Sequence, residues 1–199
     1  HAAMGALGDA GATVVTVGIA DLQRQLVDTS LYVNCSKSDL NAFLGARPGA
    51  PLRTLEQVYE TRQYHPMLDL LEACVVGPSL PEYDPQYFRR LAAREVFQRQ
   101  ITNLMATHRL DALVFPDVQV PAPTREQLGT RVWTTLTYPT NTLIASQAWL
   151  PAITVPAGMV EGRLPVGLEF MGRPYDEATL FRLAYAFEQA TRHRRAPVL

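Results

Sequence analysis

The sequence is poor in the residues from which metal sites and disulfide frameworks are built. Its two cysteines, Cys35 and Cys74, are far apart and form no C-x-x-C pair, which argues against a disulfide framework or a structural zinc site. The four histidines share no i, i+4 spacing and have no neighbouring cysteine, so we expect no metal site. Two free thiols are typical of a reducing compartment, and we expect a cytoplasmic protein.

Charged residues are also scarce, and those of opposite sign nearly cancel. They make up 19% of the 199 residues, and 18 Lys+Arg against 19 Asp+Glu leave a net charge of -1. This balance lacks the basic surface that nucleic acid binding requires. Because proline or a polar residue interrupts every apolar stretch, no run approaches the roughly 20 residues that span a bilayer. We therefore expect neither nucleic acid nor a membrane as partner.

A complete catalytic motif is missing as well. No serine lies in a G-x-S-x-G elbow or a Gly/Ser-rich loop, and no G-x-G-x-x-G or P-loop indicates a cofactor, so none is expected. Lys37 is the only lysine, and a Ser-Lys pair built from this chain would combine it with Ser36 or Ser38. A lysine in that context is more often part of a solvated turn before a helix, which is the interpretation we adopt. Asp117 after a strand and Glu169 on one are the most interesting carboxylates, although surface or loop carboxylates are the ordinary interpretation.

The residues that are present predict a sizeable core. Hydrophobic residues make up 47% of the sequence, and a chain of this length buries roughly 70% of its unfolded surface. A helix is expected over residues 2–7, and the β-branched run at 12–17 after Gly11 predicts a buried strand. Residues 38–76 favour helices, which are broken by Gly45, Pro48, Gly49 and Pro51.

Start signals mark several of the helices. Ser38 can cap the residues that follow it, and Thr54 with Gln57 has the spacing of a capping box. Asp84 and Pro85 are typical of an N-cap and a first helical residue, which predicts a long helix after them. Its apolar residues recur at three- and four-residue steps and form a core face: Phe88, Leu91, Ala92, Phe97, Ile101, Leu104 and Met105.

The second half of the chain alternates strand and helix patterns. Residues 110–115 form a short apolar strand, and 152–159 with 164–171 predict a hairpin at the edge of the same sheet. A closing helix follows, with Asp176 as its N-cap and Leu180, Leu183, Ala184 and Phe187 as its buried residues. The predicted fold class is α/β, a mixed β-sheet covered by helices. Since ligands gather beyond the ends of strands in such sheets, residues 116–124 are expected to form a pocket wall.

The segment from Asn141 to Pro197 carries motifs that are specific in combination. They are LPA at 150–152, VPAG at 155–158, LPVGL at 164–168, GRP at 172–174 and EATL at 177–180, followed by a helix with Glu188. Upstream, DLNAFL at 39–44, RTL at 53–55 and DALVFP at 111–116 fit the same pattern. With these motifs the chain closely resembles the C-terminal part of amidase signature family enzymes, over essentially its whole length.

The resemblance implies hydrolysis of a carboxamide by a serine nucleophile that a cis-serine and a lysine activate, with backbone N–H groups of a Gly/Ser-rich loop as oxyanion hole. In family members this machinery lies in the N-terminal half, and no segment here matches it, so we assign no catalytic residue. The resemblance does suggest substrate-pocket residues near the Asn of the motif: Thr134, Thr137, Tyr138, Pro139, Thr140, Asn141 and Ser146. An apolar wall formed by Tyr138, Leu143, Trp149 and Leu150 would favour an apolar or aromatic amide.

The resemblance further implies that residues 1–199 are the C-terminal part of a single amidase-like domain. Residues 1–20 would supply a helix and a strand of the sheet, 38–76 a helical cover, and 84–199 the long helix, strand, edge hairpin and closing helix. The expected partners are the N-terminal half of the same enzyme and a small-molecule amide. A detached half would expose apolar surface, and we expect it to form a homodimer or to aggregate.

Two functional hypotheses remain open at this point. In the first, the chain is part of an amide hydrolase and is inactive in isolation. In the second, it is a truncated relative without a nucleophile that serves as a binding or assembly module. Amidotransferase subunits of the family carry an acidic residue where this sequence has Thr134, which argues against a glutaminase subunit.

Overall fold

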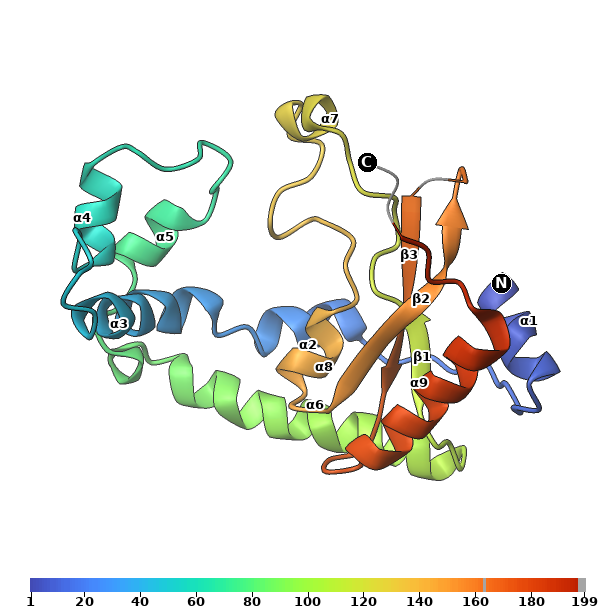
Figure 1. Ribbon diagram of the computed structural model, residues 1–199. Coiled ribbons are helices and arrows are strands. Elements are labelled where there is room, and N and C mark those ends of the chain that lie inside the picture. The colour runs from blue at the N-terminus through green and yellow to red at the C-terminus, as the bar shows by residue number, and fades with distance from the viewer. Residues whose placement is uncertain (163, 197–199) are drawn as a thin grey trace.

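The computed structural model describes residues 1–162 and 164–196, and a small sheet stands at one end, opposite the group of helices within residues 32–76 (Figure 1). The sheet order is β1-β3-β2, and both pairings are antiparallel. Its strands are β1 (Leu113–Pro116), β2 (Ala152–Val160) and β3 (Leu164–Met171). Helices pack on both faces, which confirms the predicted α/β class. Arg163 in the predicted hairpin and Pro197 at the end of the family-like segment lie outside the described residues.

The predicted hairpin is present. β2 and β3 pair along their length on either side of Glu161 and Gly162, which adopt φ angles of 53° and 72°. The hairpin does not lie wholly at the edge of the sheet, however. β1 pairs with the other side of β3, with Leu113 opposite Met171, so β3 is the central strand and β2 is the one strand of the hairpin that lies at an edge.

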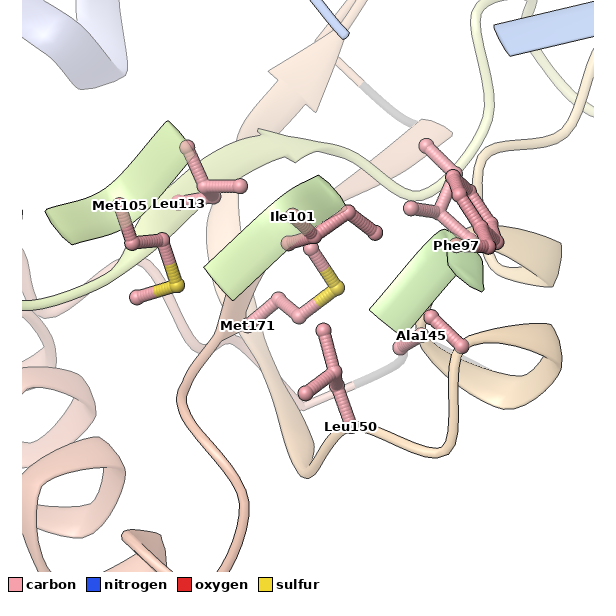
Figure 2. Packing of buried hydrophobic residues seen from close by; sticks show 9 residues of the cluster. Phe97, Ile101, Met105, Leu113, Ala145, Leu150 and Met171 are labelled. Atoms are coloured by element: carbon pink, nitrogen blue, oxygen red, sulfur yellow. The ribbon is translucent and has the colours of Figure 1, made fainter. Parts of the chain in front are cut away.

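One face of the sheet packs against α6 (Tyr87–Thr107), together with α2 (Leu22–Asp28) and α8 (Leu143–Gln147). Phe97, Ile101 and Met105 of α6 are fully buried, and their four-residue spacing places them on one side of the helix. They pack with Leu150 and Met171 in one cluster (Figure 2). This part of the predicted apolar face is confirmed.

The first half of α6 differs from the prediction. The helix begins at Tyr87, later than Pro85, and Asp84 accepts a hydrogen bond from the Gln86 N–H at 2.8 Å without being the N-cap. Phe88 is 62% exposed, because this end of the helix extends beyond the sheet (Figure 1). The prediction that Phe88 is a core residue is therefore wrong, and so is that for Ala92, which is also exposed. Although α6 has 21 residues, no helix in the described part of the chain is both long and apolar enough to cross a membrane.

The opposite face of the sheet packs against α9 (Glu177–Thr191). Its residues Leu180, Ala184 and Phe187 are buried together with residues of β3, as predicted. Asp176 is the N-cap residue, also as predicted, and its carboxylate accepts a hydrogen bond from the Thr179 hydroxyl at 2.7 Å. Burial of one helix face thus follows directly from the residue spacing.

Three helices pack on one another away from the sheet (Figure 1). They are α3 (Tyr32–Gly45), α4 (Leu55–Glu60) and α5 (Leu71–Val76). Thr54 caps α4 as predicted, accepting a hydrogen bond from the Gln57 N–H at 3.2 Å. Ser38 is not a cap, because α3 already begins at Tyr32 and Ser38 lies inside it. Short 3-10 helix η1 (Pro81–Tyr83) leads from this group to α6.

The N-terminal segment confirms one prediction and contradicts another. Helix α1 (Ala2–Asp9) is present and packs beside α9. The strand predicted at residues 12–17 is wrong, since this run is irregular and pairs with none of the described strands. Val14 and Val15 are exposed, whereas Val17 packs against the cluster around α6. β-branched residues favour a strand, but a strand also requires a neighbouring backbone with which to pair.

Candidate substrate pocket

A cavity of about 830 Å³ opens between two segments that are far apart in the sequence. One wall is the loop at 65–69, between α4 and α5. The other is the segment at 123–140, which includes the short helix α7 (Arg125–Gly129). The lining residues are His65, Met67, Asp69, Pro123, Arg125, Leu128, Gly129, Arg131, Trp133, Thr134, Thr135, Tyr138 and Thr140.

Local hydrogen bonds shape the 123–140 wall. Thr124 and Gln127 form a capping box at the start of α7: the Gln127 N–H donates to the Thr124 hydroxyl at 3.2 Å, and the Thr124 N–H donates to Gln127 Oε1 at 2.9 Å. Beyond the helix, the Thr134 N–H donates to the Thr137 hydroxyl at 2.8 Å. These bonds satisfy backbone donors that a loop would otherwise leave to water.

A single carboxylate joins the two walls. Asp69, on the first wall, accepts hydrogen bonds from the Thr135 N–H at 2.9 Å and from the Thr135 hydroxyl. These two bonds, with a smaller contribution from the positive charge of Arg131, lower the pKa of Asp69. An ionised Asp69 therefore ties the 65–69 loop to the 123–140 segment across the cavity.

The lining combines an apolar surface with a few charges. Met67, Leu128, Trp133 and Tyr138 supply the apolar part, and the two aromatic rings meet edge to face with 5.9 Å between their centres. Such a surface suits an aliphatic or aromatic group. The described lining contains no serine, cysteine or lysine, so it can bind and orient a molecule but offers no activated nucleophile of those types.

The Thr140 end of the second wall is anchored on the residue that follows β1. The Asp117 carbonyl accepts hydrogen bonds from the Asn141 N–H at 2.7 Å and from the Thr140 hydroxyl at 3.2 Å. The Gln119 N–H donates to the Pro139 carbonyl at 2.9 Å. The position of this wall thus depends on the segment that leaves the sheet.

The side chain of Asp117 meets a buried carboxyl group. Glu169, in β3, is only 4% exposed and is hydrogen-bonded to Asp117. Burial raises the pKa of Glu169 to about 7, and the hydrogen bond and negative charge of Asp117 add to the rise. The interpretation of Glu169 as an exposed carboxylate is therefore wrong.

The structure gathers some of the predicted pocket residues at the cavity and leaves others away from it. Thr134, Tyr138 and Thr140 line the cavity. Thr137, Pro139 and Asn141 do not line it but take part in the hydrogen bonds that hold the same segment. Ser146 lies apart on α8, where its hydroxyl donates to the Leu143 carbonyl at 3.2 Å. Of the wall predicted at 116–124, Pro123 reaches the lining.

The apolar wall predicted from the sequence is not assembled as expected. Of its four members only Tyr138 lines the cavity; Leu143 and Trp149 are exposed elsewhere, and Leu150 is buried against α6. The reason is that α8 directs Ile144 and Ala145 into the core, which leaves Leu143 on its exposed side. The guanidinium of Arg94 lies 5.7 Å from the centre of the Trp149 ring.

Lys37 has structural partners. Its Nζ lies 2.7 Å from Glu56 Oε1 and donates to the Val75 carbonyl at 3.0 Å, so it ties α3 to α4 and α5. The Ser36 hydroxyl donates to the Tyr32 carbonyl at 2.5 Å. Lys37 lies within α3, and the prediction of a solvated turn at this position is wrong.

Sequence reasoning missed the 65–69 wall and the contact between Asp117 and Glu169. The burial of Glu169 could have been predicted from the sequence. Glu169 lies between Leu168 and Phe170, and such an apolar run is typical of a strand that is buried on both faces. The 65–69 loop carries no comparable signal, since nothing in a proline-broken connection indicates which distant segment it faces.

Comparison with known proteins identifies the family. The family model described as Amidase matches residues 1–181. The matching subunit of the glutamyl-tRNA(Gln) amidotransferase from Exiguobacterium sibiricum is 32% identical across 96% of this chain, and its counterpart from Geobacillus stearothermophilus is 38% identical across 59%. The crystal structure of the native peptide amidase from Stenotrophomonas maltophilia matches 98% of this chain with a TM-score of 0.73 and 32% identity.

The fold and these matches place the protein in the amidase signature family. The chain belongs to the amidase family, as its motifs indicated. It spans 41% of the Exiguobacterium sibiricum protein and 40% of the peptide amidase.

Proposed function

We propose that this chain is the C-terminal part of an amide hydrolase and forms the substrate-binding side of its active site. The enzyme converts a carboxamide to a carboxylate and ammonia or an amine. The main support is the 830 Å³ cavity, because it brings together Thr134, Tyr138 and Thr140, which the family resemblance had singled out.

The serine nucleophile, in this proposal, comes from the N-terminal half of the same enzyme. The chain spans about 40% of its relatives' length, and its sequence contains no Gly-Gly pair and no Gly/Ser-rich loop. Its one lysine is bound to Glu56 and the Val75 carbonyl. The two free thiols, Cys35 and Cys74, are consistent with work in the reducing cytoplasm.

The substrate we propose is a small amide with an aliphatic or aromatic group. Met67, Leu128, Trp133 and Tyr138 form the surface on which that group packs. Asp69 already accepts a hydrogen bond from Thr135 and so joins the 65–69 loop to the 123–140 segment. It is therefore not a free carboxylate that would bind a positively charged substrate.

The test compares two variants of the intact enzyme that contains these 199 residues. Trp133→Ala removes an aromatic ring from the lining and is expected to raise KM for an aromatic amide about tenfold, the equivalent of roughly 1.4 kcal/mol of binding. Leu136→Ala is the matched control, since Leu136 lies in the same segment but is 77% exposed and outside the lining. Equal effects of the two variants, or a preference for charged amides, would contradict the proposed substrate class.

The competing hypothesis of a binding or assembly module is tested with the isolated 22.1 kDa chain. On our proposal it is inactive alone and supports turnover when the N-terminal half is supplied. Turnover by the isolated chain at the rate of the complete enzyme would show that the nucleophile lies within these residues. A complete two-part protein that hydrolyses no amide would favour the binding module.

A second candidate activity is that of a glutaminase subunit. The relatives at 32% and 38% identity are amidotransferase subunits by name, which favours it. The family resemblance implies an acidic residue at the position of Thr134 in such subunits, which argues against it. The substrate preference of the intact enzyme distinguishes a glutaminase from the proposed amide hydrolase, since a glutaminase prefers glutamine to an aromatic amide.

A further inference from the structure

The side chain of Asp117 lies across the central strand of the sheet. A Cβ added at Gly167 would lie 1.9 Å from Asp117 Oδ2, so the carboxylate occupies the space that a larger residue would fill. It accepts a hydrogen bond from the Thr154 hydroxyl of β2 at 2.8 Å and is hydrogen-bonded to Glu169, which is on the same face of β3 as Gly167. One side chain thus connects all three strands.

In the described part of the chain, no contact places a basic side chain beside the carboxyl groups of Asp117 and Glu169. The neighbours of Glu169 across the sheet are Phe115 and Thr154, and neither α8 nor residues 12–19 contain an ionisable side chain. The charged residues of α2 and α6 contact other groups. Arg24 pairs with Asp28, and Arg99 pairs with Glu95. Arg90 and Arg94 donate hydrogen bonds to carbonyls of residues 27–30, and Arg89 is exposed. Asp117 is the charged group that contacts Glu169.

When two carboxyl groups are in contact and one of them is buried, ionising both is unfavourable, because the charges repel each other and the buried one is poorly solvated. One proton between them removes the repulsion and supplies the hydrogen bond. Burial first, and Asp117 second, raise the pKa of Glu169 to about 7. The pair therefore holds its proton in mildly acidic solution and loses it near neutrality.

The backbone of Asp117 carries part of the cavity wall. Its carbonyl accepts hydrogen bonds from the Asn141 N–H and the Thr140 hydroxyl, and Val118 forms an isolated β-bridge with Thr140. Asp117 is less buried than Glu169 and lies outside a regular strand, so repulsion between the carboxylates acts mainly on Asp117. Movement of Asp117 is transmitted to Thr140 through these bonds.

We propose that Asp117 and Glu169 are positioning residues for the cavity: the proton they share holds the Thr140 wall in place, and its loss displaces that wall. The inference rests on the proposed function only in treating the cavity as the substrate site. In the intact enzyme the displaced wall weakens substrate binding, so KM rises with pH through the transition while kcat changes less.

The experiment uses the full chain with Trp149→Phe, which leaves Trp133 as the single tryptophan and a reporter inside the cavity. Trp133 fluorescence and the ¹³C carboxyl shift of Glu169 are followed from about pH 5.5 to 8.5. We expect one common midpoint near neutrality. Glu169→Gln should abolish the fluorescence transition, because its amide N–H donates to Asp117 at every pH and does not titrate.

Two further variants complete the test. His65 is the histidine that lines the cavity, so His65→Gln is the control and should retain the transition. Asp117→Asn should lower the pKa of Glu169 in the ¹³C titration and abolish the fluorescence transition, because an amide is not repelled by an ionised Glu169, and this provides a second reading if Glu169→Gln folds poorly.

Three results would overturn the inference. They are a transition that persists in Glu169→Gln but is lost in His65→Gln, a Glu169 carboxyl that titrates near its ordinary value of 4.5, and a Glu169 titration near 7 to which Trp133 does not respond. None of these readings requires amide turnover, so a failure of the proposed function remains distinguishable from a failure of the inference.

Discussion

The Thr154 hydroxyl donates a hydrogen bond of 2.8 Å to Asp117 Oδ1, which joins the edge strand β2 to the residue after β1 across the central strand β3. The contact lies over Gly167. A Cβ at this position would be 1.9 Å from Asp117 Oδ2 and 2.7 Å from the Thr154 methyl group. A glycine is required here by the approach of two side chains, since its backbone is not in the left-handed region.

Gly167→Ala is therefore expected to displace the Asp117 carboxylate. We expect a loss of about 1–3 kcal/mol in the free energy of unfolding, as for other insertions into packed sites. The pKa of Glu169 should fall, because Asp117 no longer adds to the effect of burial. Urea denaturation and a ¹³C carboxyl titration measure the two effects. Gly45→Ala is the control, since open space surrounds Gly45, and a Glu169 pKa that is the same in wild type and Gly167→Ala would count against this account.

The stability of the chain should depend on the protonation of Glu169. Its pKa is raised to about 7 in the folded chain, against an ordinary value of 4.5, so the folded state retains a proton that the unfolded chain releases. The resulting stabilisation is fully present below about pH 4.5 and is lost as the pH rises through 7. The slope is at most about 1.4 kcal/mol per pH unit, reduced by whatever water reaches the pair. Denaturation of wild type and Glu169→Gln between these limits measures it, and a difference that stays constant with pH would refute the assignment.

The ion pair between Lys37 and Glu56 predicts the opposite pH dependence. The hydrogen bond from Lys37, the largest cause, lowers the pKa of Glu56 to about 2. Its contribution is present above the ordinary pKa and is lost as the pH falls through 2. Because Glu56 is partly exposed, we expect Lys37→Met to cost only about 0.5–1 kcal/mol at pH 7 and less in acid.

Chemical denaturation of Lys37→Met and wild type at pH 7 and in acid measures this loss of stability. Arg24→Ala is the control, because the pair of Arg24 with Asp28 is exposed and local. A Lys37→Met variant as stable as Arg24→Ala at pH 7 would show that the tie between α3, α4 and α5 contributes nothing measurable.

A buried hydroxyl joins the segment after α2 to α8. The Thr29 Oγ1 is fully buried and lies 2.6 Å from Gln147 Oε1. Thr29→Val keeps the shape but leaves the Gln147 oxygen without its donor, for which we expect a loss of about 1–3 kcal/mol in thermal or urea unfolding. Thr102→Val is the matched control, since that hydroxyl bonds only to carbonyls of its own helix. Equal losses of stability in Thr29→Val and Thr102→Val would mean that the hydrogen bond between Thr29 and Gln147 contributes no more than one within a helix.

Features that depend on residues a few positions apart could be predicted from the sequence. The cap at Thr54, the start of α9 at Asp176 and the turn after β2 each follow from neighbouring residues, and the structure confirms them. Family membership is of the same kind, because the short motifs between residues 141 and 180 survive as local patterns.

Features that depend on distant partners were decided by tertiary structure alone. The run at 12–17 has the composition of a strand but no neighbouring strand, and Phe88 has the spacing of a core residue at a helix end that extends past the core. The same holds for the cavity, whose 65–69 wall is joined to the other by Asp69 and Thr135. Propensity acts within a few residues, whereas strand pairing, burial and the pKa of Glu169 depend on what the folded chain brings alongside.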